Sequence, residues 1–321
     1  MIIVVLLLIG GLLPLCVSHA ERDRPVRIGA LTESWGPTPS IVGLRDGLVE
    51  LGYREEKDFF LGIRFTQGNL ADVPVAAREL VEQEVDFIFA VGVNAAKAAQ
   101  AATRQIPIIF ATVDDPVAFG LIESYARPGG NITGVDDLGI QLGPKRLQLF
   151  SEMIPGLKRV LFPYNVTDTV SLQEFRTYRQ AAGRLGIEVV GLPLRTQAEA
   201  RTMLMRGQDT KVQGFLSPRY LYLNIPGFVL QAASEQNIPT MFPDAFFVER
   251  EGGLASYGPD IYKSGKLAAR LVDKILKGAK PAELPVEVNT NFEFAINLKL
   301  AQELGMTIPA EVLFQATKVI R

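Results

Sequence analysis

The sequence contains a single cysteine and a single histidine in 321 residues, and both lie near its beginning. Cys16 and His19 fall within MIIVVLLLIGGLLPLCVSHA, a segment with no charged side chain. If this segment is removed, the remaining chain has no thiol or imidazole to act as nucleophile, general base or metal ligand, and it has no disulfide. Carboxylate, lysine and tyrosine side chains remain possible catalytic groups. The sequence therefore predicts no catalytic residue, no metal site and no cofactor.

The first twenty residues resemble a secretory leader. Their apolar run is interrupted by Gly10, Gly11 and Pro14, and small residues at Ser18 and Ala20 fit a signal-peptidase site. Residues 1–20 are thus expected to be a cleaved signal peptide, and the mature chain to begin near Glu21 in the periplasm.

Two other interpretations of this segment compete with cleavage. An uncleaved membrane anchor would need a longer apolar run without helix breakers. A lipoprotein anchored through Cys16 would need a different sequence from Leu13-Pro14-Leu15 ahead of the cysteine. Cleaved export is the favoured interpretation.

The sequence also lacks a surplus of either positive or negative charge. The net charge is −2, hydrophobic residues make up 48% of the chain and charged residues 21%, which is typical of a globular protein and not of a disordered one. No basic surplus favours a nucleic acid or an anionic membrane surface as partner. The length allows two domains with full cores.

Strand and helix patterns alternate along the chain in two series. The first series comprises strands in VRIGALT, FLGIRF, VDFIFAV and IPIIFAT, with helices at Ser40–Gly52 and from Asp72, its expected cap. The second comprises strands in KRVLFPYN, IEVVGLPL, VQGFLSP and IPTMFPD, with helices at 171–185, 198–205 and 221–236. Two such series predict an α/β protein with two doubly wound, Rossmann-like lobes.

The C-terminal part adds a short strand in GGLASYG, a helix over 259–276 that ends at Gly278, and two strands in LPVEVNTNFEFAINL. These elements could return to the first lobe and recross, which would give a hinge of three segments. The expected division is residues 26–134 plus 259–283 for the first lobe and 135–258 plus 284–321 for the second.

Three long stretches resemble a known family. VRIGALTESWGPTPSIVGLRDGLVELGY, IPIIFATVDDPVAFGLIESYARPGGNITGV and the segment from GGLASYGPD to LGMTIP are similar to ABC-transporter substrate-binding proteins of the tryptophan/tyrosine type. The resemblance covers about Val26 to Pro309. It implies a type I periplasmic-binding-protein fold with a ligand held between two lobes.

Candidate ligand-binding residues in the first lobe follow the ends of predicted strands, where ligands sit in open α/β sheets. Gly92 allows close backbone approach, and Val93 and Asn94 stand where the family usually carries Thr or Ser with Pro. Asn94 either caps a helix from Ala95 or contacts the ligand. Asp115 before Pro116 suggests a helix start, which leaves Asp114 as the freer carboxylate for a ligand ammonium.

The remaining candidates are spread over both lobes. Tyr164 could stack on a planar ligand while Asn165 donates or accepts hydrogen bonds, Ser217 follows another strand end, and Asp244 is a second candidate for an ammonium. Arg219 either binds an acidic ligand or is a solvated surface charge, the interpretation slightly favoured. Trp35 either walls the cleft or is a half-buried loop aromatic. The crossovers are expected at Gly134 and Tyr257.

Together these features predict a monomeric, exported receptor that captures an amino-acid-like or small aromatic or carboxylated compound and delivers it to an ABC permease in the inner membrane. A sensor domain that reports the ligand to a partner protein would use the same fold. An enzyme without histidine is the less favoured alternative.

Overall fold

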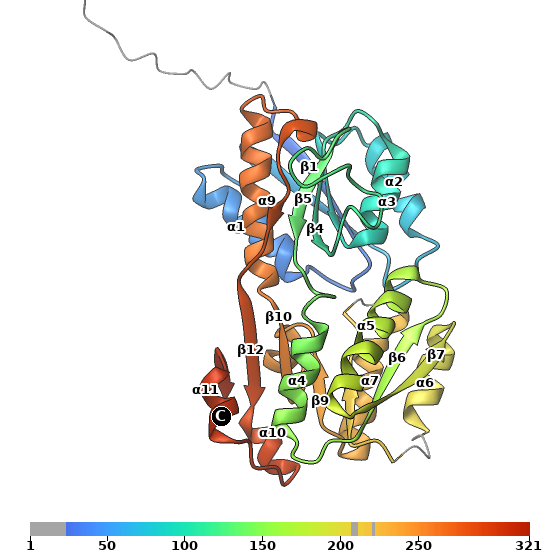
Figure 1. Cartoon of the computed structure of the whole chain (residues 1–321). Helices are drawn as coiled ribbons and strands as arrows, with labels where there is room; N and C mark the ends of the chain where they lie inside the picture. Colours follow the sequence, from blue (N-terminus) through green and yellow to red (C-terminus); the bar gives the residue numbers. More distant parts are fainter. Residues whose placement is uncertain (1–23, 207–210, 220–221) are drawn as a thin grey trace, which may run out of the picture.

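The computed structural model describes residues 24–206, 211–219 and 222–321 (Figure 1). The expected signal peptide, including Cys16 and His19, lies outside the described residues, and so does Leu221, the predicted start of a helix. Within the described ranges, no helix is both long enough and apolar enough to cross a bilayer.

The first lobe is built on a six-stranded sheet with the order β11-β5-β4-β3-β1-β2. Its paired strands are all parallel. The strands are β1 (Val26–Thr32), β2 (Phe59–Phe65), β3 (Phe87–Val91), β4 (Ile108–Val113), β5 (Ile132–Asp136) and β11 (Glu287–Val288). The helices are α1 (Pro39–Glu50), α2 (Val73–Glu82), α3 (Val93–Ala102) and α9 (Ile261–Leu276).

These helices cover both faces of the first sheet. Side chains of α2 and α3 pack with one set of strand residues, and side chains of α1 and α9 pack with another. All five residues of β3 are buried as a result. This double burial explains why the strand reads as one uninterrupted apolar run.

The second lobe is built on a seven-stranded sheet with the order β13-β12-β10-β9-β8-β6-β7. Its strands are β6 (Arg159–Asn165), β7 (Glu188–Leu194), β8 (Gly214–Leu216), β9 (Thr240–Phe242), β10 (Ala255–Pro259), β12 (Phe292–Asn297) and β13 (Lys318–Ile320). Its helices are α4 (Gly143–Met153), α5 (Thr169–Leu185), α6 (Gln197–Met205), α7 (Ile225–Gln236), α8 (Phe246–Glu249), α10 (Leu298–Glu303) and α11 (Ala310–Gln315). Short 3₁₀ turns lie at Tyr222–Asn224 and Pro281–Glu283. β10 and β12 pair antiparallel, and the other strand pairs described in this lobe are parallel.

The chain passes between the lobes three times, after β5, after β10 and after β11 (Figure 1). Two of these passages lie later than the sequence pattern indicated. β5 continues to Asp136, two residues beyond the expected boundary at Gly134, and β11 keeps residues 287–288 in the first sheet although 284–321 were assigned to the second lobe. The reason is that LPVEVNTNFEFAINL is divided between two sheets, which apolar periodicity cannot reveal.

Helix α9 joins the first lobe through very close contact with α1. A Cβ atom on Gly43 would stand 2.0 Å from the Tyr262 carbonyl oxygen, and one on Gly265 would stand 2.0 Å from the Ser40 carbonyl oxygen. The two helix backbones can touch only because both positions are glycine. The first lobe is therefore assembled from two distant parts of the chain.

Candidate functional site

A cavity of about 420 Å³ lies between the lobes, and we call it the interlobe cavity. Its first-lobe wall comes from the carboxyl ends of β1, β3 and β4, and its second-lobe wall from the segments after β8 and β9. This is where ligands bind in open α/β sheets. The lining residues are Thr32, Glu33, Ser34, Trp35, Gly36, Pro37, Thr38, Pro39, Val91, Gly92, Thr112, Arg219, Asn224, Gly227, Asp244, Phe246, Phe247, Glu251 and Ile261.

Glu33 is the most unusual polar group of the interlobe cavity. It directly follows β1 and is only 5% exposed. Its Oε1 atom has no hydrogen-bond partner among the residues that the structure describes. Burial raises the pKa of the Glu33 carboxyl to about 8, and the nearby Asp168 carboxylate adds to the rise. A buried carboxyl group at a cavity wall with one unpartnered oxygen can gain a hydrogen bond from a bound molecule.

The backbone at the start of α3 faces the same carboxyl group. Gly92 is the N-cap of α3 and has φ 99°, a conformation that favours glycine. A Cβ atom on Gly92 would stand 3.2 Å from Glu33 Oε2. The backbone N–H of Ala95, in the first turn of α3, lowers the Glu33 pKa and offsets a part of the burial effect. Glu33 thus lies at the positive end of this helix.

Thr112 supplies a second polar atom with no partner in the described part of the chain. Its Oγ1 atom is buried and lacks a hydrogen bond. Its φ is +56°, which is uncommon for a β-branched residue, and the β4–β5 register shifts between Phe110 and Val113. Backbone strain of this kind costs of order 1–3 kcal/mol and concentrates at functional sites. Here it places Thr112 on the cavity wall.

The second lobe contributes a carboxyl group of its own. Asp244 is half-buried after β9, and its Oδ1 accepts a hydrogen bond from the Phe246 backbone N–H at 2.9 Å. Burial raises the Asp244 pKa, whereas the Phe246 N–H and the charge of Arg219 lower it. Carboxyl groups therefore stand on both walls of the cavity.

Aromatic side chains form the apolar walls. Trp35, in the loop after β1, is 42% exposed, and Phe246 in α8 is 40% exposed. Phe247 stacks on Phe242 with ring centroids 4.9 Å apart and meets Phe246 edge to face at 5.6 Å. Large apolar side chains left open at a concave site are typical of ligand pockets.

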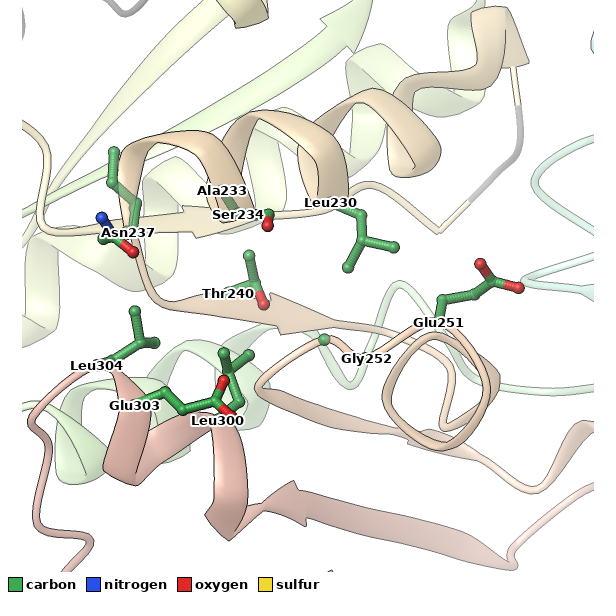
Figure 2. Close-up of a pocket in the computed structure, with 12 residues that line it drawn as sticks. Leu230, Ala233, Ser234, Asn237, Thr240, Glu251, Gly252, Leu300, Glu303 and Leu304 are labelled. Atoms are coloured by element: carbon green, nitrogen blue, oxygen red, sulfur yellow. The ribbon is translucent and has the colours of Figure 1, made fainter.

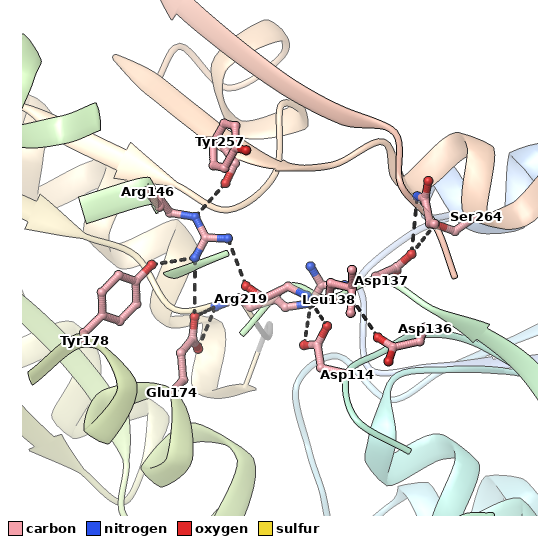
Figure 3. A network of polar contacts seen from close by, with 12 residues as sticks. Asp114, Asp136, Asp137, Leu138, Arg146, Glu174, Tyr178, Arg219, Tyr257 and Ser264 are labelled. Carbon is pink, nitrogen blue, oxygen red and sulfur yellow. Dashed lines mark hydrogen bonds and ion pairs between the residues drawn. The ribbon is translucent and has the colours of Figure 1, made fainter. Parts of the chain in front are cut away.

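A network of buried charges lies beside this cavity and links both lobes (Figure 3). We call Asp114, Asp137, Arg146, Glu174 and Arg219 the hinge cluster. Arg219, after β8, forms ion pairs with Asp114 at 3.2 Å and with Asp137 at 3.1 Å. Its backbone N–H donates to Glu174 at 3.1 Å. Arg219 thereby ties the second lobe to the end of β4 and to the first crossover.

Arg146 occupies the second-lobe end of the hinge cluster. It is fully buried on α4 and donates from Nε to the Tyr257 carbonyl oxygen at 2.6 Å and from Nη1 to the Tyr178 hydroxyl. Its ion pair with Glu174 spans 3.9 Å. Burial raises the Glu174 pKa to about 7, while the charge of Arg146 lowers it.

The crossover segments meet at Asp137. Its carboxylate accepts hydrogen bonds from the Ser264 hydroxyl and, at 3.4 Å, from Asn289 Nδ2. Burial raises the Asp137 pKa to about 7, and Arg219 lowers it. Residues next to all three crossovers are thus joined by polar contacts.

Comparisons with known proteins decide the family. The model of the ABC transporter substrate binding protein family matches residues 30–320. The chain belongs to this family of substrate-binding proteins. A tyrosine-binding protein of Clostridioides difficile (strain R20291) is 27% identical over 290 residues, which cover 90% of this chain and 83% of that protein.

Two solved structures are similar over almost the whole substrate-binding protein. An ABC domain from Streptococcus pneumoniae in complex with L-Trp has a TM-score of 0.81 at 27% identity, covering 92% of this chain and all of that one. A conserved domain protein from Vibrio cholerae has a TM-score of 0.83 at 28% identity, covering 93% and 100%. The two lobes are those of a type I periplasmic-binding-protein fold, and the protein is a solute-binding receptor.

The substrate-binding protein brings four of the predicted site residues to the interlobe cavity, namely Trp35, Gly92, Arg219 and Asp244. The others lie elsewhere. Val93 and Ser217 are fully buried inside their lobes, and Gly134 lies in β5, where a Cβ would stand 2.3 Å from the Phe110 carbonyl oxygen. Tyr164 stacks on Phe175 with centroids 4.3 Å apart.

Asn165 and Tyr257 also serve the architecture of the second lobe. The Asn165 side-chain oxygen accepts hydrogen bonds from the backbone N–H and the hydroxyl of Thr167, at 2.9 and 2.8 Å. The Tyr257 ring packs on Phe292 and Phe294. Neither side chain belongs to the cavity lining.

Several local predictions are wrong. Asn94 does not cap a helix from Ala95, because α3 already begins at Val93 with Gly92 as its cap; the Asn94 amide instead faces Asp168 of the second lobe. Asp115 accepts from the Ala118 N–H at 3.1 Å, but it starts a series of turns and no helix.

The other errors concern charged groups and one cap. Asp72 occupies the N-cap position of α2 as predicted, but its side chain makes no capping hydrogen bond. Arg219 is not a solvated surface charge, since it is 7% exposed and paired with two carboxylates. Asp114 is paired with Arg219 and accepts a hydrogen bond from the Gly139 N–H, so it is not the freer carboxylate of its pair.

Sequence reasoning missed Glu33, Thr112 and the phenylalanines of α8. The signal for Glu33 was present, because it follows the first strand directly and precedes Trp35, which the same rule selected. Nothing in the local sequence distinguishes Thr112, since its backbone strain exists only in the folded chain.

A smaller hollow of about 200 Å³ lies on the second lobe (Figure 2). It is formed between α7, β9 and α10, with Leu230, Thr240 and Leu300 among its walls. Glu251 is the one described residue that lines both this hollow and the interlobe cavity. Its lining includes neither an unpartnered buried polar atom nor residues of the first lobe, so the interlobe cavity is the candidate binding site.

Proposed function

We propose that this receptor captures a small molecule with a protonated amino group on an aromatic-sized body, and that it delivers this ligand to a separate ABC permease. The observation that carries the proposal is Glu33, a buried carboxyl group whose Oε1 has no partner in the described structure and which lines the interlobe cavity.

An ammonium group suits this environment chemically. It donates up to three hydrogen bonds, and Glu33 Oε1 and Thr112 Oγ1 are two oxygen atoms that can accept them and have no partner among the described residues. A cation next to Glu33 also favours the ionised carboxylate, although burial alone raises its pKa to about 8. Binding therefore converts a costly buried group into a charge-assisted hydrogen bond.

The rest of the cavity suits an aromatic-sized body. A volume of about 420 Å³ lies within the range of small-molecule pockets. Trp35 and the two phenylalanines of α8 offer flat apolar surface. Relatives named as a tyrosine-binding protein and as a complex with L-Trp support a ligand of this size.

Capture is proposed to proceed by hinge bending. Residues 24–136 with 261–288 would move as one body and residues 143–259 with 292–320 as the other, with the three crossovers between them. Because residues of both bodies line the cavity, a ligand that contacts both stabilises the closed state. Residues 1–20 are proposed to direct export of the monomeric receptor and to be cleaved before Glu21.

The test combines identification and transport. Protein purified from the periplasm of its own cells is expected to carry a small amine in native mass spectrometry, and its N-terminal sequence is expected to begin near Glu21. Cells that lack the gene should lose uptake of that labelled amine and regain it with the wild-type gene. Undiminished uptake would contradict delivery, and a co-purified ligand without an amino group would contradict the assigned chemistry.

A further inference from the structure

We infer that the preferred ligand is an aromatic amine without a carboxylate, in other words a decarboxylated aromatic amino acid rather than the amino acid itself. This inference rests on the proposed function above and specifies the ligand class of the same cavity. It follows from what already occupies the anion-binding positions of the interlobe cavity.

The first position is the N-terminus of α3. Unpaired N–H groups and the helix dipole make such a terminus the natural place for a ligand carboxylate. Here the chain's own Glu33 carboxyl group stands against Gly92 and the Ala95 N–H. It is 5% exposed and its Oε1 remains without a partner among the described residues. A ligand carboxylate would have to displace or approach this acid.

The second position is Arg219. It is the one basic residue among the described residues that line the cavity, against the three acidic residues Glu33, Asp244 and Glu251. Its guanidinium group already forms ion pairs with Asp114 and Asp137. A ligand carboxylate would compete with two buried protein carboxylates for this cation.

Three of the four hydroxyl groups that line the cavity, those of Thr32, Ser34 and Thr38, are engaged within the chain, whereas Thr112 Oγ1 has no partner in the described structure. The Thr32 hydroxyl donates to Ser34 Oγ at 3.1 Å, and the Ser34 hydroxyl donates to the Gly36 carbonyl oxygen at 2.6 Å. Thr38 and Ser40 share a hydrogen bond of 2.9 Å between their hydroxyl groups. The cavity thus offers carboxyl groups to a cation, whereas an anion would find only neutral donors besides the paired Arg219.

The test compares three compounds on one aromatic body by calorimetry: tyramine, L-tyrosine and 3-(4-hydroxyphenyl)propionate. They carry the amine alone, both groups, and the carboxylate alone. Tyramine is expected to bind at least tenfold more tightly than tyrosine, and the propionate to show no binding. The same order is expected for tryptamine over L-tryptophan.

Variants connect the preference to Glu33. Glu33→Gln should weaken tyramine binding about tenfold or more and reduce its advantage over tyrosine, because the competing charge at α3 is removed. Glu79→Gln, an exposed carboxylate on the same lobe, is the matched control and should leave both affinities unchanged. Circular dichroism and thermal unfolding would verify that each variant is folded.

The outcomes separate this inference from the proposed function. Tyrosine binding more tightly than tyramine would overturn the inference and leave the proposed function standing. Binding of the propionate alone, or of none of the aromatic compounds, would overturn both. An unchanged tyramine-to-tyrosine ratio in folded Glu33→Gln would remove Glu33 as the cause of the preference and overturn the inference.

Discussion

The hinge cluster and the interlobe cavity both bury carboxyl groups, but they treat them in opposite ways. In the hinge cluster, Asp114 and Asp137 are paired with Arg219, and Glu174 with Arg146. In the cavity, Glu33 has an oxygen without a partner among the described residues. Desolvation raises the pKa of Glu33, Asp137 and Glu174 alike.

The difference separates a structural role from a binding role. Carboxylates paired within the chain complete a connection between lobes, and their removal is felt as lost stability. A carboxyl group that lacks a donor costs stability in the free protein and recovers it when a ligand supplies the donor. Burial and perturbed pKa do not distinguish the two roles, whereas the partner does.

The largest expected effect is on the free energy of unfolding and comes from removing a cation of the hinge cluster. Arg219→Met keeps much of the side-chain volume but leaves Asp114 and Asp137 buried without their shared cation. The free energy of unfolding should fall by about 3–5 kcal/mol. Urea denaturation measures it.

The matched control for this loss is Arg159→Met. Arg159 pairs with Glu188 at 2.9 Å on the surface of the same lobe, with its side chain 35% exposed. Such exposed pairs contribute about 0–1 kcal/mol. Equal losses in the two variants would show that the hinge cluster is no stronger than a surface ion pair.

A second prediction concerns Glu33, the carboxyl group of the interlobe cavity. Glu33→Gln should make the ligand-free protein more stable near pH 8 by about 1–3 kcal/mol, because it removes an unsatisfied buried acid. The folded pKa of Glu33 is about 8 against an ordinary value of 4.5, so the folded state binds more protons between these values. Wild-type stability therefore falls as pH rises through this window.

The pH dependence is the diagnostic part of this measurement. Asp137 and Glu174, with pKa values of about 7, affect wild type and variant equally. The Asp168 carboxylate raises the pKa of Glu33, so the difference measures Glu33 together with this coupling. The stability difference should be near zero at pH 4.5 and reach its plateau above pH 8. Thermal unfolding at several pH values measures it, and a difference independent of pH would mean that Glu33 keeps an ordinary pKa.

A smaller effect is expected on ligand affinity from a cavity residue outside the hinge cluster. Phe246→Ala removes an aromatic wall and should weaken a stabilising aromatic ligand about five- to tenfold, on the scale of one aromatic contact. Calorimetry measures the affinity. Phe314→Ala, at a side chain that is 93% exposed on α11, is the control and should change nothing. Equal losses in both variants would exclude Phe246 from the site.

The smallest effect is spectroscopic. A ligand at a hundredfold excess over its dissociation constant should add about 2.7 kcal/mol of stability. Because Trp35 lines the cavity and is 42% exposed, the same ligand should shift tryptophan emission. Trp35→Phe should abolish that signal and preserve most of the thermal shift. Strong stabilisation with unchanged emission would place the ligand away from Trp35.

Much of the fold was predictable because its strands are chemically uniform. VRIGALT was predicted as a strand, and β1 spans the same Val26–Thr32. Helix α4 escaped prediction because its inward face carries Arg146, a fully buried charge that reads as a surface residue. The return of residues 259–283 to the first lobe was predicted, but the place of β11 was not, because β11 and β12 are neighbours in sequence and pair in different sheets.

The candidate site was less predictable because it depends on pairing across the lobes. Asp114 and Arg219 both follow strand ends, but no local pattern shows that each neutralises the other. Their pairing leaves Glu33 as the acid with an unfilled position. The rule about strand ends located the site, and the contacts made after folding decided which of its acids a ligand can reach.

The close packing of α9 against α1 has a consequence for biosynthesis. The first lobe cannot complete its core until the chain has been made through α9 and β11, since Gly265 must meet Ser40 and β11 must join β5. At about 5–20 residues per second, translation to that point takes on the order of tens of seconds. During this time the early strands lack their covering helix. The first lobe is therefore expected to fold only after most of the polypeptide has been made.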